Sequence, residues 1–585
     1  MRYLLPHLID AGAADRPDHP AVRCRKDSLD YATLTRRANG LARLLIEDGV
    51  RPGERVGIFM PKSVECAVAL YGIMKAGAVY VPLDPTAPEE RVAFVIGDCG
   101  IRRLVAHPRR RRQLDRLVTA GVALDAVFGV DAAEGVAPRS YGWDDLGPAE
   151  TPPPTRVTED DLCYILYTSG STGVPKGIMH THRSALAWAR VSAATYGLGP
   201  ADRISNYAPL HFDLSTLDYF AGALAQATTV MVPEEHLKLP ASLAALIAEE
   251  RLTLFYTVPF ALIQLLLHGA LERHEWDALR WVLFGGEPMP VRHLAALMRR
   301  WPGARFSNVY GPTETNGCTW YPVPEPPAEG TGALPIGRMY DNAEGIVVDD
   351  ADEEVAHGEL GELLVRAPTS MRGYWGRPDL NEKVFFYRRR YEGLPETFVR
   401  TGDLVRLNDA GELEFHGRGD RLVKTRGYRV ELDEVEAVLG RHPAVEEAAT
   451  WAVPDDSGSV LIHAAATLAD AGPGPADGGA TDESGATESG AAGSGMTGTG
   501  TSAADAGDPR TSTGKDVDLV TDASVNDIQR LFKDQRVNIV GKTFKVCLIN
   551  HIEVASCREK SPDNPFPVSD LARRDFTINS MAYDP

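Results

Sequence analysis

The segment Tyr167–Gly177 carries the clearest local chemistry in the sequence. It reads YTSGSTGVPKG and follows the apolar stretch LCYILY, which predicts a buried strand. Small residues leave backbone N–H groups free to surround phosphate oxygens, hydroxyl groups can donate further hydrogen bonds, and Lys176 adds a positive charge. The spacing does not fit the GxxxxGK[ST] pattern of a Walker loop, so the segment is not a phosphate-binding loop of that kind. A flexible Gly/Ser linker is the alternative, and the strand before it together with the Pro-Lys-Gly closure disfavour that interpretation.

Three later segments could add to such a site. In NVYGPTET, residues 308–315, Tyr310 offers an aromatic face for a base and Glu314 a carboxylate for Mg²⁺. In RTGD, Asp403 follows a strand-like run, where one carboxylate could accept two ribose hydroxyls. Residues 417–427 form a basic, glycine-containing segment. Each of the three is also compatible with an ordinary turn or a solvated loop, so none identifies a site alone.

The elements that must position these segments alternate between helix and strand. Residues 41–50 predict an amphipathic helix and 55–60 a buried strand, then 67–78 a helix and 79–84 a strand. This alternation continues to about residue 395. It predicts an α/β fold in which helices cover mainly parallel sheets.

The pattern changes after residue 398. Residues 398–423 predict short strands joined by the turns NDAG and GRGD, and 431–443 an amphipathic helix with Leu432, Val435, Val438 and Leu439 on one face. A tract of Gly, Ala, Ser, Thr and Asp from about 468 cannot bury enough apolar surface to order itself. Ordinary composition returns with predicted strands and a helix in 516–521, 524–532, 542–549 and 551–556.

Amino-acid composition excludes several classes of protein. The 585 residues are 44% hydrophobic and carry a net charge of −20, which argues against a general nucleic-acid or membrane-surface binder. The N-terminus gains charge too early for a signal peptide, and no apolar run approaches the ~20 residues of a membrane span. Seven scattered cysteines form no CxxC pair. We therefore expect a cytoplasmic protein in a reducing compartment, with no membrane partner.

The order of the segments is more specific than any one of them. The chain resembles the adenylate-forming superfamily from about residue 5 to 468, and within it the amino-acid adenylation domains of nonribosomal peptide synthesis. The segments that carry the resemblance are YGIMKAGAVYVPLDP, YTSGSTGVPKG, HFDLSTLDYF, NVYGPTET, GELLVRAPTSMRGYW, RTGDLVR and GRGDRLVKTRGYRVELDEVE. This resemblance implies an α/β fold with a large N-terminal region and a small, mobile α+β C-terminal subdomain.

The resemblance also implies roles for matching residues in ATP binding. Adenine would lie against Tyr310 beside Gly285 and Gly286, and Glu314 would bind Mg²⁺. The loop residues expected at the β- and γ-phosphates are Thr168, Ser169, Gly170, Ser171, Thr172, Gly173 and Lys176.

Further roles fall on the second half of the chain. Asp403 would hold the ribose hydroxyls with help from Arg418, and Asp420 would be the hinge of the small subdomain. The family needs a catalytic lysine on a Pro-x-Thr-x-x-Gly-Lys loop, which PRTSTGK provides at Lys515. The low-complexity tract stands where a helix and a strand should precede that loop, so a rigid mount for Lys515 is in question.

The expected substrate is a small apolar amino acid. Asp213 matches the residue that pairs with the substrate's α-ammonium group, and its alternative role is a helix N-cap. An acyl- or aryl-activating enzyme would lack this acid, because a buried unpaired carboxylate is costly. Family spacing places apolar or small residues around the substrate side chain, and they resemble those of prolyl-activating members: Leu214, Leu217, Ala261, Leu283, Gly285, Val309, Gly317 and Cys318.

No condensation signature and no carrier attachment signature occur in this region. The resemblance therefore implies transfer of the activated amino acid to the phosphopantetheine thiol of a separate peptidyl carrier protein. The expected organisation is an adenylation core at 1–417, the start of the small subdomain at 418–467, a flexible tract at 468–508, the lysine loop at 509–515 and a different fragment at 516–585.

That fragment resembles the head of tRNA nucleotidyltransferases and poly(A) polymerases. The matching segments are KDVDLVTD, HIEV and DLARRDFTIN. Asp516 and Asp518 alternate on a predicted strand and could share Mg²⁺. The GGxVRD loop and the helical domains of that family are missing, so we expect a truncated, inactive head that binds no nucleic acid.

Four functions remain open from sequence. The first is amino-acid adenylation with transfer to a carrier thiol. The second is acyl- or aryl-CoA ligation, which would require that Asp213 does not face the substrate. The third is nucleotidyl transfer by the C-terminal segment, and the fourth is ATP binding without turnover.

Overall fold

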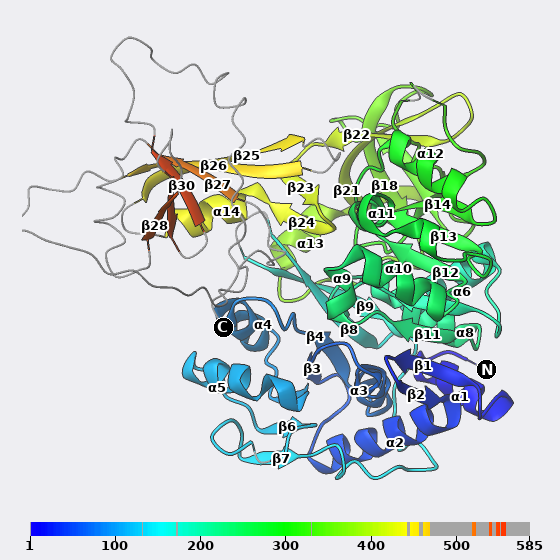
Figure 1. The fold of residues 1–585 in the computed structure, drawn as a ribbon, viewed down its shortest axis with the longest axis vertical. Helices are drawn as coiled ribbons and strands as arrows, with labels where there is room; N and C mark the ends of the chain where they lie inside the picture. Colours follow the sequence, from blue (N-terminus) through cyan, green and yellow to red (C-terminus); the bar gives the residue numbers. More distant parts are fainter. Residues whose placement is uncertain are drawn as a thin grey trace, which may run out of the picture. The chain divides into compact units, whose positions relative to one another are not determined.

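Two large sheets, both mainly parallel, organise the first 435 residues (Figure 1). The computed structural model describes residues 2–131, 133–170, 174–328, 330, 332–441, 445–454, 460–468, 517–521, 537–540, 546–549 and 552–556. By its internal contacts the chain divides into two units. The first is Met1–Val435 with Ala452–Leu461, and the second is Glu436–Trp451 with Ile462–Pro585.

The first sheet has nine strands. In spatial order they are β16 (Arg338–Met339), β15 (Thr319–Val323), β14 (Arg305–Tyr310), β13 (Trp281–Gly285), β12 (Leu254–Thr257), β10 (Arg203–Asn206), β11 (Thr228–Met231), β1 (Pro20–Cys24) and β2 (Asp27–Asp30). The strands from β14 to β1 run parallel, and β15, β16 and β2 are antiparallel at the two edges. The parallel register places Gly285 of β13 beside Val309 of β14.

The second sheet has eight strands. In spatial order they are β19 (Gly373–Tyr374), β9 (Lys176–Thr181), β8 (Leu162–Thr168), β4 (Val79–Pro82), β3 (Arg55–Phe59), β5 (Arg103–Ala106), β6 (Ala126–Phe128) and β7 (Arg139–Tyr141). The strands from β8 to β7 are parallel, because each follows a helical or long connection. The pair β8–β9 is an antiparallel hairpin.

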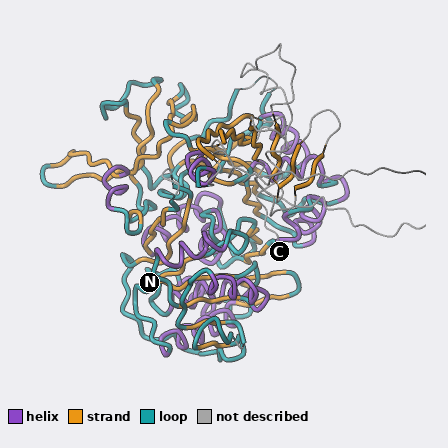
Figure 2. The backbone as a smooth tube through the Cα atoms, turned by 90° about the vertical axis from the view of Figure 1, so that its left-hand side faces the viewer, coloured by secondary structure: helices purple, strands orange, loops and turns teal. Residues whose placement is uncertain are grey.

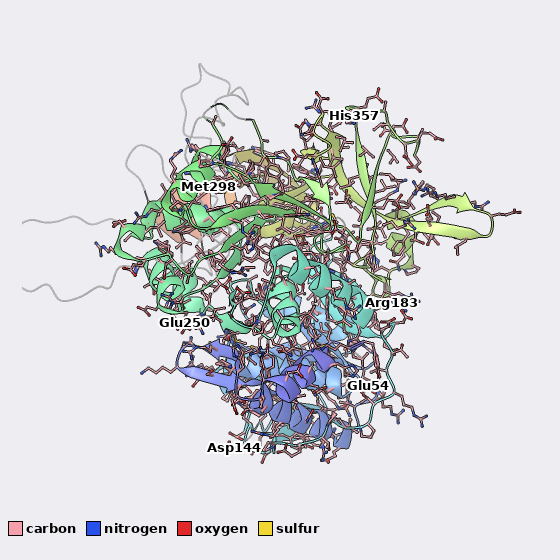
Figure 3. The ribbon with its side chains drawn as sticks, turned by 90° about the vertical axis from the view of Figure 1, so that its right-hand side faces the viewer. Glu54, Asp144, Arg183, Glu250, Met298 and His357 are labelled. Carbon is pink, nitrogen blue, oxygen red and sulfur yellow. The ribbon has the colours of Figure 1, made fainter. Side chains whose placement is uncertain are left out.

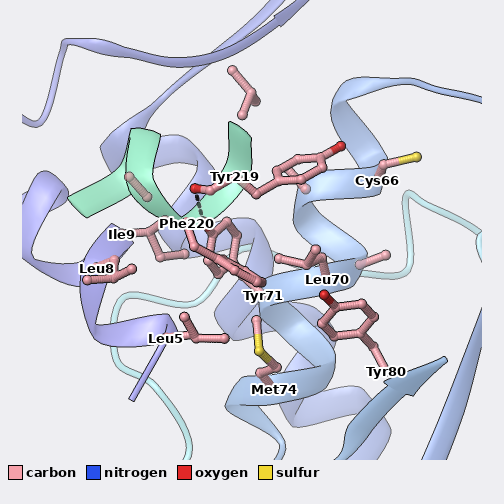
Figure 4. Packing of buried hydrophobic residues seen from close by; sticks show 14 of the residues in the cluster. Leu5, Leu8, Ile9, Cys66, Leu70, Tyr71, Met74, Tyr80, Tyr219 and Phe220 are labelled. Carbon is pink, nitrogen blue, oxygen red and sulfur yellow. Dashed lines mark hydrogen bonds between the residues drawn. The ribbon is translucent and has the colours of Figure 1, made fainter. Parts of the chain in front are cut away.

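The main core lies between these two sheets. It joins strand residues of both sheets to the faces of four helices: α1 (Pro6–Asp15), α2 (Tyr31–Glu47), α3 (Val64–Lys75) and α6 (His182–Tyr196). Figure 4 shows part of it, where Tyr71 of α3 packs against Phe220 and donates a hydrogen bond to the carbonyl of Tyr219 at 3.0 Å. Because α3 is buried along nearly its whole length, it is apolar on all sides rather than amphipathic.

Two further cores cover the outer faces of the sheets. Figure 2 shows helices (purple) beside the strands (orange), and Figure 3 labels Met298, a buried residue of the first of these cores. The face of the nine-stranded sheet is covered by α10 (Pro240–Glu249), α11 (Pro259–His268) and α12 (Val291–Arg300). The eight-stranded sheet is covered by α4 (Glu89–Asp98) and α5 (Arg111–Thr119). The result is five layers, helix–sheet–helix–sheet–helix, as expected for two parallel sheets that each bury both faces.

A third sheet follows. Its strands are β17 (Glu344–Val348), β18 (Leu360–Arg366), β21 (Leu394–Leu407), β20 (Phe385–Tyr391) and β22 (Leu413–Arg418), all antiparallel. The short helix α13 (Pro378–Val384) precedes β20. A separate two-stranded hairpin, β23 (Leu422–Thr425) and β24 (Tyr428–Glu431), comes next and is followed by α14 (Leu432–Leu439).

A six-stranded sheet spans the later part of the chain. Its order is β25 (Val445–Pro454), β26 (Val460–Leu468), β27 (Val517–Thr521), β30 (Ile552–Ser556), β29 (Val546–Ile549) and β28 (Val537–Val540). Strand β26 pairs in parallel with β27, so residues expected in the small subdomain and in the C-terminal fragment share one sheet.

The α/β fold expected from sequence is confirmed. The helices and strands predicted within 41–84 are present as α2, β3, α3 and β4. Val438, expected on the apolar face of its helix, is 41% exposed. Strand β28 was not predicted from sequence, and the tract 468–508 and the predicted helix 524–532 lie essentially outside the described residues. Among the described residues, no helix is both long enough and apolar enough to cross a bilayer.

The close approach of β13 and β14 gives a stability prediction. A Cβ atom at Gly285 would lie 2.2 Å from the carbonyl oxygen of Val309, a backbone atom that cannot rotate away. Gly285→Ala should therefore destabilise the protein by about 1–3 kcal/mol, the typical cost of overpacking. The measurement is the midpoint of urea unfolding. Gly303→Ala is the control, because a Cβ there meets no atom within 4 Å, and an equal loss in both variants would contradict the prediction.

Candidate active site

The phosphate-binding loop predicted from sequence closes the β8–β9 hairpin. Thr168 pairs with Lys176 across the hairpin, so both ends of the loop are fixed by the sheet. A Cβ at Gly170 would lie 2.1 Å from the carbonyl oxygen of Val174, which explains why glycine stands there. The Thr168 hydroxyl is buried and has no hydrogen-bond partner among the described residues, which leaves a donor at the loop for a ligand.

Glu314 is the centre of a buried charge cluster. Its side chain is 3% exposed and follows the end of β14. It accepts a hydrogen bond from the Tyr374 hydroxyl at 2.8 Å, and it forms ion pairs with Lys176 at 3.3 Å and Arg429 at 3.0 Å. The Lys176 ammonium also lies 4.7 Å from the centre of the Tyr374 ring.

These contacts fix the ionisation of Glu314. Burial alone would raise the pKa of this carboxyl, but the charges of Arg429 and Lys176 outweigh it and hold the pKa far below its usual range. These two cations therefore favour the ionised form of Glu314. An ionised, buried carboxylate is the group that a divalent cation requires.

Asp403 is the centre of a second cluster. It is fully buried in β21, and it accepts hydrogen bonds from the Tyr310 hydroxyl and the Arg418 guanidinium. Arg418 also binds Asp420 at 2.6 and 2.7 Å. The residues expected at adenine, ribose and hinge therefore form one connected chain, from Tyr310 to Asp420.

The β23–β24 hairpin lies against both clusters. The Ser169 hydroxyl donates a hydrogen bond to the carbonyl of Arg429 at 2.8 Å, which ties the hairpin to the loop. The Lys424 ammonium lies 5.6 Å from the centre of the Tyr310 ring, and the ring of Tyr428 meets that of Phe212 edge-on at 5.5 Å. Burial lowers the pKa of Lys424, while Asp403 opposes the shift.

Asp213 stands at the start of a three-residue helical turn before η2 (Leu217–Ala221). Its backbone is helical, with φ −62° and ψ −25°, and its side chain caps no helix N–H group. The N-cap role considered from sequence is therefore absent. Burial raises the pKa of Asp213, while a hydrogen bond from Thr313 and the Lys424 charge oppose the rise.

Most residues expected around the substrate side chain lie near the carboxyl ends of the parallel strands, where open α/β sheets bind ligands. Leu283 and Gly285 are in β13, Val309 is in β14, and Cys318 precedes β15. Leu217, Ala261, Leu283, Gly285, Val309 and Cys318 are buried, and Leu214 and Gly317 are half-buried. A Cβ at Gly317 would lie 2.3 Å from the Trp188 ring. Gly286 follows Gly285 with φ +93° and is exposed.

A pocket of about 210 Å³ opens beside the loop. It is lined by the loop residues Gly170, Val174 and Lys176, by Glu314, and by Arg429 and Glu431 of the hairpin. The pocket brings together cations and carboxylates from segments that are about 250 residues apart in sequence.

Several expected site residues cannot be compared with the structure. Ser171, Thr172, Gly173, Lys515 and Asp516 lie outside the described residues. Asp518 belongs to β27 by its backbone, and its side chain is not described.

Sequence reasoning assigned no role to Tyr374, Lys424, Arg429 or Glu431. Each belongs to a segment that carried the family resemblance, GELLVRAPTSMRGYW or GRGDRLVKTRGYRVELDEVE. The available signal was an arginine within a glycine-containing basic turn. Its role follows only from its contact with Glu314 in the folded chain.

Comparison with known proteins identifies the family. Residues 9–375 match the family described as AMP-binding enzyme. The chain belongs to the AMP-binding enzyme family. Together with the fold, this confirms the expected relationship to the adenylate-forming enzymes and the expected ligase class.

Individual members of the AMP-binding family resemble this chain over most of its length. The chain is 36% identical over 447 residues to an L-proline–[L-prolyl-carrier protein] ligase of Pseudomonas fluorescens, covering 76% of this chain and 85% of the relative. It is 36% identical over 460 residues to a protein of the same name from Streptomyces coelicolor, covering 76% and 83%. A solved nonribosomal peptide synthetase protein with adenylation and PCP domains has a TM-score of 0.67 at 25% identity, covering 80% of this chain and 77% of that one.

A second match lies outside the AMP-binding region. Residues 509–585 match the family described as Poly A polymerase head domain. The expected resemblance of the C-terminal segment is thus confirmed. This match includes Pro509–Lys515, so both family resemblances overlap on the segment expected to carry the catalytic lysine.

Two buried histidines beside the loop give a pH prediction. Burial lowers the pKa of His180 and of His182 to about 4, from an ordinary value of 6.5. The unfolded chain therefore binds more protons than the folded chain between pH 4 and 6.5. Stability should be fully present above pH 6.5 and fall as the pH drops toward 4, by as much as about 3 kcal/mol per histidine.

Urea unfolding at a series of pH values measures this effect. His182→Gln should reduce the slope of the unfolding free energy against pH between pH 4 and 6.5. The reduction should be up to half of the slope that His180 and His182 contribute together. The control is His268→Gln at an exposed position. A slope that is identical in wild type and His182→Gln would contradict the prediction.

Proposed function

We propose that this chain uses ATP to convert a small apolar amino acid, with proline favoured, to an aminoacyl-AMP with release of pyrophosphate. The aminoacyl group then passes to the phosphopantetheine thiol of a separate carrier protein. The observation that carries the proposal is the carboxyl group of Asp213, which caps no helix and forms no ion pair within 4 Å among the residues that the structure describes.

The α-ammonium group of an amino acid would supply the missing counter-charge. A carboxylate that loses part of its hydration is costly unless it is paired. Asp213 is half-buried, and the charge of Lys424 favours its ionised form. An acyl or aryl acid without an amine would leave Asp213 uncompensated.

The character of the expected side-chain space supports an apolar substrate. Leu217, Leu283 and Val309 are buried in the core between the sheets, and Ala261, Gly317 and Cys318 are small. None of these residues could pair with a charged side chain. The names of two relatives, both prolyl-carrier protein ligases, favour proline within this class.

The residues present fit ATP and Mg²⁺. The orphaned Thr168 hydroxyl and the Lys176 ammonium are suited to phosphate oxygens, and the ionised Glu314 to a divalent cation. Asp403 is suited to ribose hydroxyls and Tyr310 to a base. When bound, the metal would neutralise phosphate charge; Lys176 and Thr168 would orient the triphosphate for in-line attack on the α-phosphorus.

Both half-reactions balance without a further reagent. In the first, a carboxylate oxygen of the amino acid bonds to the α-phosphorus and the bond to the pyrophosphate oxygen breaks. In the second, the carrier thiol loses its proton and its sulfur bonds to the carbonyl carbon, and AMP leaves. A carrier on another chain is supported by the names of the relatives, which join an amino acid to a carrier protein.

Substrate class is tested by amino-acid-dependent exchange of pyrophosphate into ATP across a panel of amino acids and of carboxylic acids without an amine. Proline and small aliphatic amino acids should support exchange, and Asp213→Asn should abolish it because the ammonium loses its charge partner. Asp409→Asn, at an exposed position, is the matched control. Robust exchange with acids that lack an amine would instead indicate an acyl- or aryl-CoA ligase.

The ATP-binding assignment gives a separate prediction. Glu314→Gln and Asp403→Asn should each lower kcat/KM for exchange by a factor that corresponds to roughly 2–4 kcal/mol, because each removes a charge proposed to act on metal or ribose. Glu392→Gln, on an exposed turn, is the control. Unchanged kinetics in both site variants would exclude the proposed roles.

A further inference from the structure

His180 is a buried histidine of β9 that the proposed reaction does not use. Both of its ring nitrogens have polar partners. The Nε2 atom lies 2.9 Å from the carbonyl oxygen of Thr313. The Nδ1 atom lies 3.2 Å from the Ser184 hydroxyl and 3.4 Å from the amide nitrogen of Asn316.

The contact with Thr313 decides which ring nitrogen carries the proton. A carbonyl oxygen can only accept a hydrogen bond, so the Nε2 atom of His180 must be the donor. Burial lowers the pKa of His180 to about 4, which keeps the ring neutral at neutral pH and leaves Nδ1 as an acceptor for the Asn316 amide. A single tautomer therefore makes both contacts.

Thr313 and Asn316 belong to the same turn, between β14 and β15. The Asn316 backbone is left-handed, with φ +55°, a conformation that asparagine adopts more readily than most residues. Glu314, the residue proposed to bind Mg²⁺, lies between these two positions in the chain. His180 thus contacts the turn on both sides of the proposed metal ligand.

The same turn reaches the residue proposed to bind the amino acid. The Thr313 hydroxyl donates a hydrogen bond to the Asp213 carboxyl and opposes the rise that burial causes in the pKa of that group. Because Thr313 and Glu314 are adjacent in the chain, a shift of the Thr313 carbonyl would move the contacts of both carboxyl groups. A misplacement of about 1 Å can cost about 100-fold in rate, so this one bond from His180 matters to both parts of the site.

We propose that His180 is a positioning residue for the reaction, whose Nε2–H group fixes the turn that carries Glu314 to the metal and Thr313 to Asp213. The inference rests on the proposed function, because it takes Glu314 as the metal ligand and Asp213 as the partner of the substrate's ammonium group. His180 acts through the backbone of Thr313, and it needs no change of protonation to do so.

Two amide substitutions separate the bond to Thr313 from the rest of the histidine. In His180→Gln the side-chain amide reaches the place of Nε2 and can still donate to the carbonyl of Thr313. In His180→Asn the side chain is one methylene shorter, and its amide reaches only the place of Nδ1. The first variant should therefore keep the positioning bond, and the second should lose it.

His182→Gln is the matched control for stability. His182 is also buried, but its ring accepts a hydrogen bond from the Leu5 N–H at 3.3 Å instead of binding the turn. Urea unfolding of all three variants measures how much stability each substitution removes. The binding and kinetic measurements are then made where every variant is folded.

The first readout is equilibrium dialysis of radiolabelled ATP against the full chain at saturating Mg²⁺, which needs no turnover. The affinity should fall about tenfold in His180→Asn and less than about twofold in His180→Gln and His182→Gln. The second readout is amino-acid-dependent pyrophosphate exchange. The KM for the amino acid should rise about tenfold in His180→Asn and stay within about twofold in the other two variants.

Three results would overturn the proposal. Equal losses in His180→Asn and His180→Gln would show that the bond to Thr313 is not what matters, and unchanged binding in both would remove the role of His180. A loss in His182→Gln as large as that in His180→Asn would trace the effect to stability alone.

Failure of the proposed function has a different signature. A wild-type chain that binds Mg²⁺-ATP but exchanges pyrophosphate with no amino acid would refute amino-acid activation. The comparison of ATP affinity between His180→Asn and His180→Gln would still decide whether His180 positions the turn.

Discussion

The ionised carboxylate of Glu314 has to be compensated in a buried position, and much of the site is arranged around that requirement. An uncompensated carboxylate at this depth would cost several kcal/mol or take up a proton. Lys176 from β9, Tyr374 from β19 and Arg429 from β24 converge on it. Strands far apart in sequence are thus held at one point by a single negative charge.

The same requirement explains how the site is connected to the fold. Strands β9 and β19 are neighbours in the eight-stranded sheet, whereas Glu314 follows β14 of the nine-stranded sheet. Their side chains meet where the two sheets are adjacent, at the carboxyl end of β14. Asp403 repeats the arrangement with Tyr310 and Arg418, so a second buried charge joins the third sheet to the first.

Sequence patterns were sufficient for much of this arrangement. Period and composition predicted the alternation of helix and strand, because each buried strand and helix face carries its own apolar signal. The loop at Thr168–Lys176 and the motifs around Glu314 and Asp403 could be recognised because their residue types and order are specific. The contacts of Arg429 and Lys424 could not be predicted, because a basic turn has the same sequence pattern whether solvent or a carboxylate lies next to it.

Other differences have physical causes as well. Asp213 could be an N-cap by residue type, and only its helical backbone angles show that its side chain serves no cap. Val438 fits an apolar helix face by spacing, but its exposure depends on what packs against that face. The partner strand of β26 was beyond sequence reasoning, because strand pairing across a long intervening tract leaves no local pattern.

The β8–β9 hairpin has a consequence for how this region tolerates change. Because Thr168 and Lys176 are paired, the sheet fixes the ends of the loop, and the entropy of closing a loop grows only slowly with its length. Insertions between these anchors should therefore cost little folding stability, whereas Gly170 is held to glycine by its close approach to the Val174 carbonyl. Folding stability alone thus places little limit on the length of this loop, which leaves that length to be set by the ligand that the loop surrounds.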